Sequence, residues 1–174
     1  MSSAPTARPI ARLVTELRIT GVGQLAIGVA GLLVPIYASD VSPVRMIVPF
    51  VIVVLLIGGL SLYNTAWLRR DESQGAAPGA RVESSSDTLR RSLVSLALAV
   101  VAVSVVGAFG PPLAAVLGGV VAGVGAVDLY NHRHTRAREA RTGETVFREL
   151  GRSPFAAGRR PIYTRPRNDS TLAM

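Results

Sequence analysis

The sequence predicts an all-α integral membrane protein, with four transmembrane helices arranged as two helical hairpins. Hydrophobic residues make up 49% of its 174 residues and are grouped in blocks. The four blocks, at 19–37, 46–67, 93–109 and 113–130, would span roughly 26 to 33 Å as helices, close to the core thickness of a bilayer. Arginine residues gather in the segments outside these blocks.

Charged residues are nearly absent from the four blocks, because only Asp128, near the end of the last block, carries a charge. A charge at the centre of a transmembrane helix costs about 2.5 to 3.5 kcal/mol, so this absence favours membrane spans. The third and fourth blocks are separated by 107–112 (GAFGPP), whose two adjacent prolines remove backbone donors and predict a tight turn. A second turn is expected at 37–43.

The distribution of arginine predicts the orientation. All 19 basic side chains are arginine, and all but Arg45 lie before the first block, between the second and third, or after the fourth. By the positive-inside rule, both termini and the central linker are cytoplasmic and both turns are outside. No Ala-x-Ala site follows the first block cleanly, so we expect an uncleaved helix in a bacterial plasma membrane.

These boundaries divide the chain into five parts: a cytoplasmic segment 1–18, a hairpin 19–67, a linker 68–92, a hairpin 93–131 and a basic cytoplasmic tail 132–174. The linker is rich in Ser, Gly and Ala and is expected to be a solvated connector. The tail is arginine-rich and is expected to be largely disordered. Within it, 142–150 (TGETVFREL) is predicted to form about two helical turns.

A short echo links the two hairpins. The stretches GGLSLYN (58–64) and GAVDLYN (125–131) each close an apolar block. Tyrosine suits a membrane interface and asparagine can terminate a helix, so the echo predicts that both helices end there. It is also consistent with an old duplication of one hairpin, although any two helices leaving a membrane on one side acquire similar residues.

Glycine residues are predicted to form the packing faces of the helices. Gly21, Gly28 and Gly31 fall on roughly one face of the first helix, while Gly119 and Gly123 form a small-xxx-small motif in the fourth. Such faces allow close backbone approach, because lipid offers no hydrophobic drive for helix association. We expect packing within the chain, with a partner helix as the alternative.

Two polar residues inside the blocks are candidate functional groups. Gln24 is expected to form a hydrogen bond to a neighbouring helix, and Asp128 an interfacial ion pair. The alternatives are a substrate or ion contact for Gln24 and a proton or ligand role for Asp128.

The basic residues flanking the helices predict contact with anionic lipid headgroups, chiefly through Arg69, Arg70, Arg133 and Arg136. The net charge of +8 therefore does not indicate a nucleic-acid partner. His132 and His134 have no cluster of carboxylates nearby, so no metal site is expected. The sequence contains no cysteine, no nucleotide-binding glycine pattern and no catalytic set, so neither a cofactor nor an enzymatic activity is expected.

These features favour a non-enzymatic accessory or scaffold subunit that packs against a larger cell-envelope membrane complex, such as a lipid or solute transport system. In size and layout alone, the chain resembles small four-helix accessory proteins of actinobacteria. Small multidrug transporters also have four helices, but their carboxylate within the first helix is missing here. A small homo-oligomeric transporter using Gln24 and Asp128, and an adaptor that recruits a cytoplasmic partner through its tail, are the alternatives.

Overall fold

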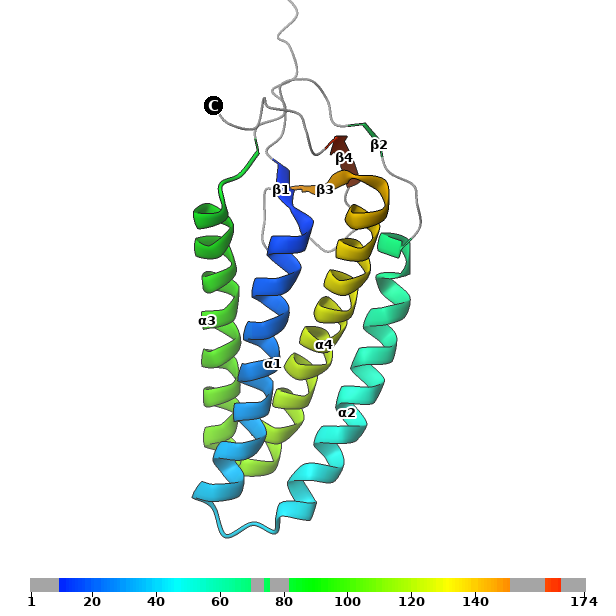
Figure 1. Ribbon diagram of the computed structural model, residues 1–174. Coiled ribbons are helices and arrows are strands. Elements are labelled where there is room, and N and C mark those ends of the chain that lie inside the picture. Colours follow the sequence, from blue (N-terminus) through cyan, green and yellow to red (C-terminus); the bar gives the residue numbers. More distant parts are fainter. Residues whose placement is uncertain (1–9, 70–73, 76–81, 151–161, 167–174) are drawn as a thin grey trace, which may run out of the picture.

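The computed structural model is a four-helix bundle with a small β-sheet at one end (Figure 1). It describes residues 10–69, 74–75, 82–150 and 162–166. The helices are α1 (Leu13–Ala38), α2 (Pro43–Asn64), α3 (Ser85–Phe109) and α4 (Pro111–Thr142), with a short 3-10 helix η1 (Ala66–Arg69) after α2. The strands are β1 (Ile10–Arg12), β2 (Gln74–Gly75), β3 (Glu144–Glu149) and β4 (Ile162–Pro166).

Local sequence signals account for several helix ends. Pro43 and Pro111 occupy the first turns of α2 and α4, where a missing backbone donor costs no helical hydrogen bond. The Ser84 side chain caps α3 by accepting a hydrogen bond from Asp87 N at 3.1 Å. Gly143 ends α4 in the left-handed conformation, with φ at 71°.

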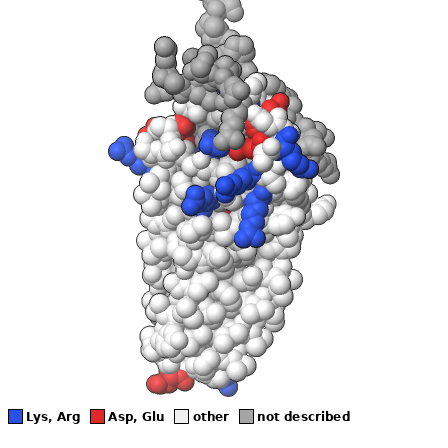
Figure 2. Space-filling model, viewed as in Figure 1, with Lys and Arg blue, Asp and Glu red and all other residues white. Residues whose placement is uncertain are grey.

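All four helices are long and apolar enough to cross a membrane. Charged side chains gather at the end of the bundle that carries the sheet, with few at the opposite tip (Figure 2). The surface between them, visible in the same view, is an uncharged belt. This distribution fits a multi-pass membrane protein.

Helix α4 is the centre of the bundle. In the most apolar 18 residues of each helix, 44% are buried in α4 but only 6% in α2. The most extensive helix contact is between α1 and α4, followed by that between α2 and α4. Consecutive α1 and α2 touch little, so the main packing unit joins helices that are distant in the sequence.

The contact between α1 and α4 depends on residues without large side chains. A Cβ atom on Gly28 would lie 2.5 Å from Gly118 O, and one on Gly21 would lie 3.0 Å from Gly125 O. A Cβ atom on Gly31 would lie 3.2 Å from Gly118 Cα. The two backbones therefore touch directly, as small residues permit in membrane helices.

A second small face of α4 holds α2. A Cβ atom on Gly119 would lie 2.9 Å from Phe50 O, and one on Gly123 would lie 3.1 Å from Val54 O. The small-xxx-small motif is thus directed at α2, while the glycines of α1 contact the other face of α4. These five predicted packing glycines lie in contacts within the chain.

The sheet combines segments from three parts of the sequence. Its strand order is β1-β3-β4-β2, with β1 and β4 antiparallel to β3 and β2 parallel to β4. Val82, just before α3, adds an isolated bridge to Ile10. The segments before α1, between α2 and α3, and after α4 are therefore joined at one end of the bundle (Figure 1).

A small apolar core attaches the sheet to the bundle. Its buried members are Leu13 and Leu17 of α1, Leu68 of η1, Val146 of β3 and Ile162 of β4. Burying side chains of this size stabilises the assembly by about 1.5 to 3 kcal/mol each. The sheet is thus packed on the helices rather than tethered to them.

The tail differs from its prediction. Residues 142–150 were expected to be helical, but 144–149 form β3, because Gly143 turns the chain and Thr145, Val146 and Phe147 favour a strand. The tail is also ordered at 132–142, which continue α4, and the expectation of disorder is wrong for β4. The remaining residues of the tail, 151–161 and 167–174, lie outside the described residues. Part of the linker is likewise ordered as β2 and the first two turns of α3.

The echo predicts only one of its two helix ends. Helix α2 stops at Asn64, as expected, but α4 continues through Asn131 to Thr142. Asn131 is 1% exposed, and its Nδ2 donates to Thr65 Oγ1 at 3.0 Å. The second copy of the echo therefore contacts Thr65, the residue that follows the first copy, through a partly buried hydrogen bond instead of ending its helix.

We expect Gly28→Ala to destabilise the protein. The added methyl would meet Gly118 O and the Ala122 backbone, which cannot yield, so unfolding free energy should fall by about 1 to 3 kcal/mol. Gly59→Ala is the matched control, because nothing lies within 4 Å of its added Cβ. Thermal unfolding in detergent should show a lower midpoint for Gly28→Ala alone. Equal midpoints would contradict the direct backbone contact.

Candidate functional site

A line of polar residues runs along one face of α1. Glu16, Thr20 and Gln24 are spaced by four residues, which places them on the same side of the helix. The Thr20 hydroxyl lies 2.9 Å from both Asp128 Oδ2 and Glu16 O and can donate to one of them at a time. The predicted polar residue Asp128 is therefore held by a neutral hydroxyl inside the α1–α4 contact.

Gln24 lies one turn deeper than Thr20. A Cβ atom on Gly125 would be 2.9 Å from Gln24 Cβ, so the side chain leaves α1 beside α4. Its Oε1 atom is buried and has no hydrogen-bond partner within the described ranges. The structure thus places Gln24 and Asp128 on the same helix contact, with Thr20 as their intermediate neighbour.

A cluster of partly buried ions lies where this polar line meets the sheet. Glu16, 7% exposed, forms ion pairs through Oε1 with Arg148 Nη2 of β3 and, at 3.5 Å, with Arg91 Nη1 of α3. Arg91 also contacts Glu83 at 3.1 Å, and Glu83 accepts a 2.8 Å hydrogen bond from Thr88. We call Glu16, Glu83, Arg91 and Arg148 the ion cluster.

A second set of contacts joins the last turns of α4 to β1, β3 and the start of α1. Arg12 pairs with Glu139 at 3.2 Å, and the other oxygen of Glu139 accepts from Val146 N at 2.9 Å. His132 Nδ1 lies 3.0 Å from Val14 O, within hydrogen-bond distance. His132 is therefore a structural contact between helices. In the described ranges, no group of three His, Cys, Asp or Glu residues is arranged to hold a metal ion.

The predicted lipid-contacting arginines fall into two groups. Arg133 and Arg136 are exposed on the final turns of α4, beyond the apolar block. Arg69 ends η1, but its side chain is not described, and Arg70 lies outside the described residues.

An open groove of about 920 Å³ lies beside the charged end of α1. Its walls come from the end of β1, α1, the first turns of α3, the last turns of α4 and the start of β3. The charged lining residues are Arg12, Arg18, Arg136, Glu139 and Glu144. The aliphatic ones include Ile19, Val22, Leu89, Leu93 and Leu96. We call this the amphipathic groove.

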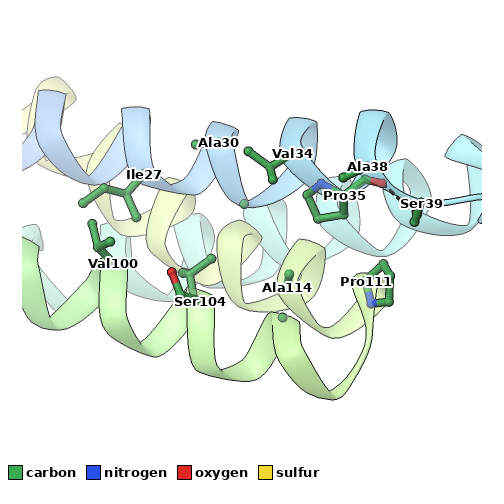
Figure 3. Close-up of a pocket in the computed structure, with 13 residues that line it drawn as sticks. Ile27, Ala30, Val34, Pro35, Ala38, Ser39, Val100, Ser104, Pro111 and Ala114 are labelled. Atoms are coloured by element: carbon green, nitrogen blue, oxygen red, sulfur yellow. Dashed lines mark hydrogen bonds between the residues drawn. The ribbon is translucent and has the colours of Figure 1, made fainter.

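A smaller apolar cavity of about 400 Å³ lies between α1 and α3, towards the opposite end of the bundle. In Figure 3, Ile27 and Val34 of α1 face Val100 and Ser104 of α3 across it. At its edge, Ser39 Oγ donates to Pro35 O at 2.7 Å, so this hydroxyl is engaged locally. The cavity can accept apolar groups but brings no charged side chain to them.

The sequence did not reveal the ion cluster. Glu16 precedes the first predicted block, and Arg148 lies in 142–150, which was predicted to form a short helix rather than a strand. The β-branched and aromatic residues after Gly143 favour a strand, and a strand predicted there would have included Arg148. That Arg148 meets Glu16 depends on long-range pairing of β1 with β3.

Glu16→Gln should lower the unfolding free energy by about 1 to 3 kcal/mol, because it leaves Arg91 and Arg148 partly buried without their shared anion. Asp40→Asn, which removes a carboxylate in the exposed α1–α2 turn, is the control. Limited proteolysis should also cleave the tail of the Glu16→Gln protein faster. Unchanged stability and cleavage would show that the ion cluster does not hold the sheet.

Comparison with protein-family models, curated proteins and solved structures found no match for this chain. No activity, substrate or partner is therefore suggested by similarity. Function has to be argued from the bundle, its exposed faces and the polar groups at its sheet end.

Proposed function

We propose that the protein is a non-enzymatic accessory or scaffold subunit that packs against a larger membrane complex of the bacterial cell envelope, such as a lipid or solute transport system. The four helices would cross the plasma membrane as two successive hairpins. Both termini and the sheet would lie in the cytoplasm, where the positive-inside rule puts the arginine-rich segments.

The outer face of α2 is the observation that carries this proposal. Gly119 and Gly123 of α4 already pack against α2, so this glycine face is not available to a partner helix. On the outer side of α2, however, nothing lies within 4 Å of a Cβ added to Gly59, and Leu55, Leu56 and Leu60 around it are exposed. An open glycine between leucines permits close approach by another transmembrane helix.

The sheet end supports a scaffold role in a different way. The segments flanking the helices are joined by strand pairing, the apolar core and the ion cluster. This end would therefore present a fixed surface to a cytoplasmic part of the same complex. If the protein recruits a cytoplasmic partner as an adaptor, we expect it to use this fixed surface rather than a free tail, because β3 and β4 are packed on the bundle.

Transport is the second candidate function, and the Thr20–Asp128 hydrogen bond is the observation that favours it. An ionisable residue inside a helix bundle is a functional candidate by default. Gln24, with its unpartnered Oε1 in the described part of the chain, extends the polar line towards the middle of α1.

Affinity capture of the tagged protein from native membranes in mild detergent should recover unlike membrane subunits. Gly59→Leu should reduce their yield about tenfold or more, because its side chain fills the open position on α2 and removes close packing. Ala102→Leu, on the exposed face of α3, adds the same side chain elsewhere and should leave the yield unchanged.

Recovery of a homo-oligomer alone would contradict the accessory role. If that oligomer also transported a solute into liposomes, and Asp128→Asn abolished the flux, transport would replace the accessory role as the proposed function. A complex equally resistant to Gly59→Leu and Ala102→Leu would exclude the outer face of α2 as its contact.

Orientation can be measured by cysteine labelling, since the sequence contains no cysteine. Ser42→Cys lies in the α1–α2 turn and Ser85→Cys at the start of α3, and both positions are exposed. In intact cells, a membrane-impermeant maleimide should label Ser42→Cys only, and lysis should make both reactive. The opposite pattern would reverse the proposed topology.

A further inference from the structure

We propose that the amphipathic groove binds one anionic phospholipid, with the phosphate at its arginine-rich end and an acyl chain along its aliphatic wall. This inference does not rest on the identity of any protein partner. It follows from the charges left without partners in the groove, from the order of its lining residues and from its volume.

The charged end of the groove retains positive charge after its internal contacts are made. Arg12 is paired with Glu139. Arg18 and Arg136 are exposed and, in the described part of the chain, form no ion pair, while Glu144 is the other acid in the lining. The groove therefore has an excess of one positive charge, and a phosphate supplies the missing anion.

The order of charges along the groove suits a headgroup above a chain. Glu144 lies on β3, within the sheet, whereas Arg18 lies more than a turn into α1 and so nearer the uncharged belt. An anion at the border of the belt would therefore meet arginine before glutamate. Phospholipid phosphates lie at this border between polar and apolar surface.

The other end of the groove is aliphatic and open. Leu89 and Leu93 of α3 and Val22 of α1 are 44%, 51% and 54% exposed. Farther along, α1 and α3 close on each other, since a Cβ atom on Gly23 would lie 2.5 Å from Leu96 Cδ1. The result is a groove with a charged mouth, an aliphatic wall and a closed floor.

This combination favours a lipid over a soluble anion. Inorganic phosphate would satisfy Arg18 and Arg136 but leave the leucines uncovered, whereas a phospholipid covers both. At about 920 Å³, the groove is within the usual size of ligand sites and can hold a headgroup with part of one chain.

The test is lipid titration of the purified full chain in nonionic detergent, followed by native mass spectrometry. The probes are dioleoyl phosphatidylglycerol and dioleoyl phosphatidylcholine, which share their chains. The first phosphatidylglycerol should bind about tenfold more tightly than phosphatidylcholine, and Arg18→Gln with Arg136→Gln should abolish that difference. Arg90→Gln with Arg133→Gln, exposed on α3 and α4 outside the groove lining, should change affinity less than about twofold.

The aliphatic wall is tested separately, with every charge retained. Leu93→Trp should obstruct the groove and weaken binding of both lipids, whereas the neighbouring Val94→Trp, outside the lining, should not. Equal losses in the two arginine pairs would overturn the proposal in favour of diffuse attraction. Equal competition by glycerol phosphate and by phosphatidylglycerol would overturn it in favour of a soluble anion.

Discussion

Direct backbone contact between α1 and α4 is the constraint on which the structure depends. In a membrane, lipid is as apolar as leucine, so helices associate through close packing rather than through the hydrophobic effect. Gly21 and Gly28 provide that closeness against Gly118, Ala122 and Gly125. A central helix with small residues on two faces then positions α2 as well. The outer sides of α2 and α3 are left as the large apolar surfaces of the molecule.

The polar groups are arranged around the same contact. Along α1, one face passes from Gln24, whose Oε1 has no hydrogen-bond partner among the described residues, through Thr20, which can donate to Asp128, to Glu16, which pairs with two arginines. The ion pairs thus form only where the helices leave the uncharged belt, because burying a charged side chain costs less there than within the belt. The ion cluster and the groove both lie at that boundary, one joining the sheet to the bundle and the other facing outward.

Much of the helical architecture was predictable, because helices that cross lipid must be apolar and their charged residues must lie outside the apolar blocks. Four apolar helices follow from that pattern, as do the positions of the turns at Pro43 and Pro111. The sheet was not predictable in the same way. Its strands are short, and their stability comes from pairing across the whole sequence and from packing on Leu13 and Leu17. Gln24 and Asp128 could be identified from the sequence because they are polar residues within apolar blocks. The pairing of Glu16 with Arg148 could be found only from the structure, because it depends on the same long-range strand pairing.

The pairing of β1 with β3 has a consequence for biogenesis. The first strand is synthesised before any span enters the bilayer, while its neighbour emerges only after the last span. Ile10 and Ala11, almost completely buried in the folded protein, therefore lack their β3 partner until the last helix has been synthesised. Closure of the sheet end of the bundle therefore follows synthesis of the last helix, so a chain terminated before β3 would display an unmatched strand edge that proteolytic surveillance can recognise.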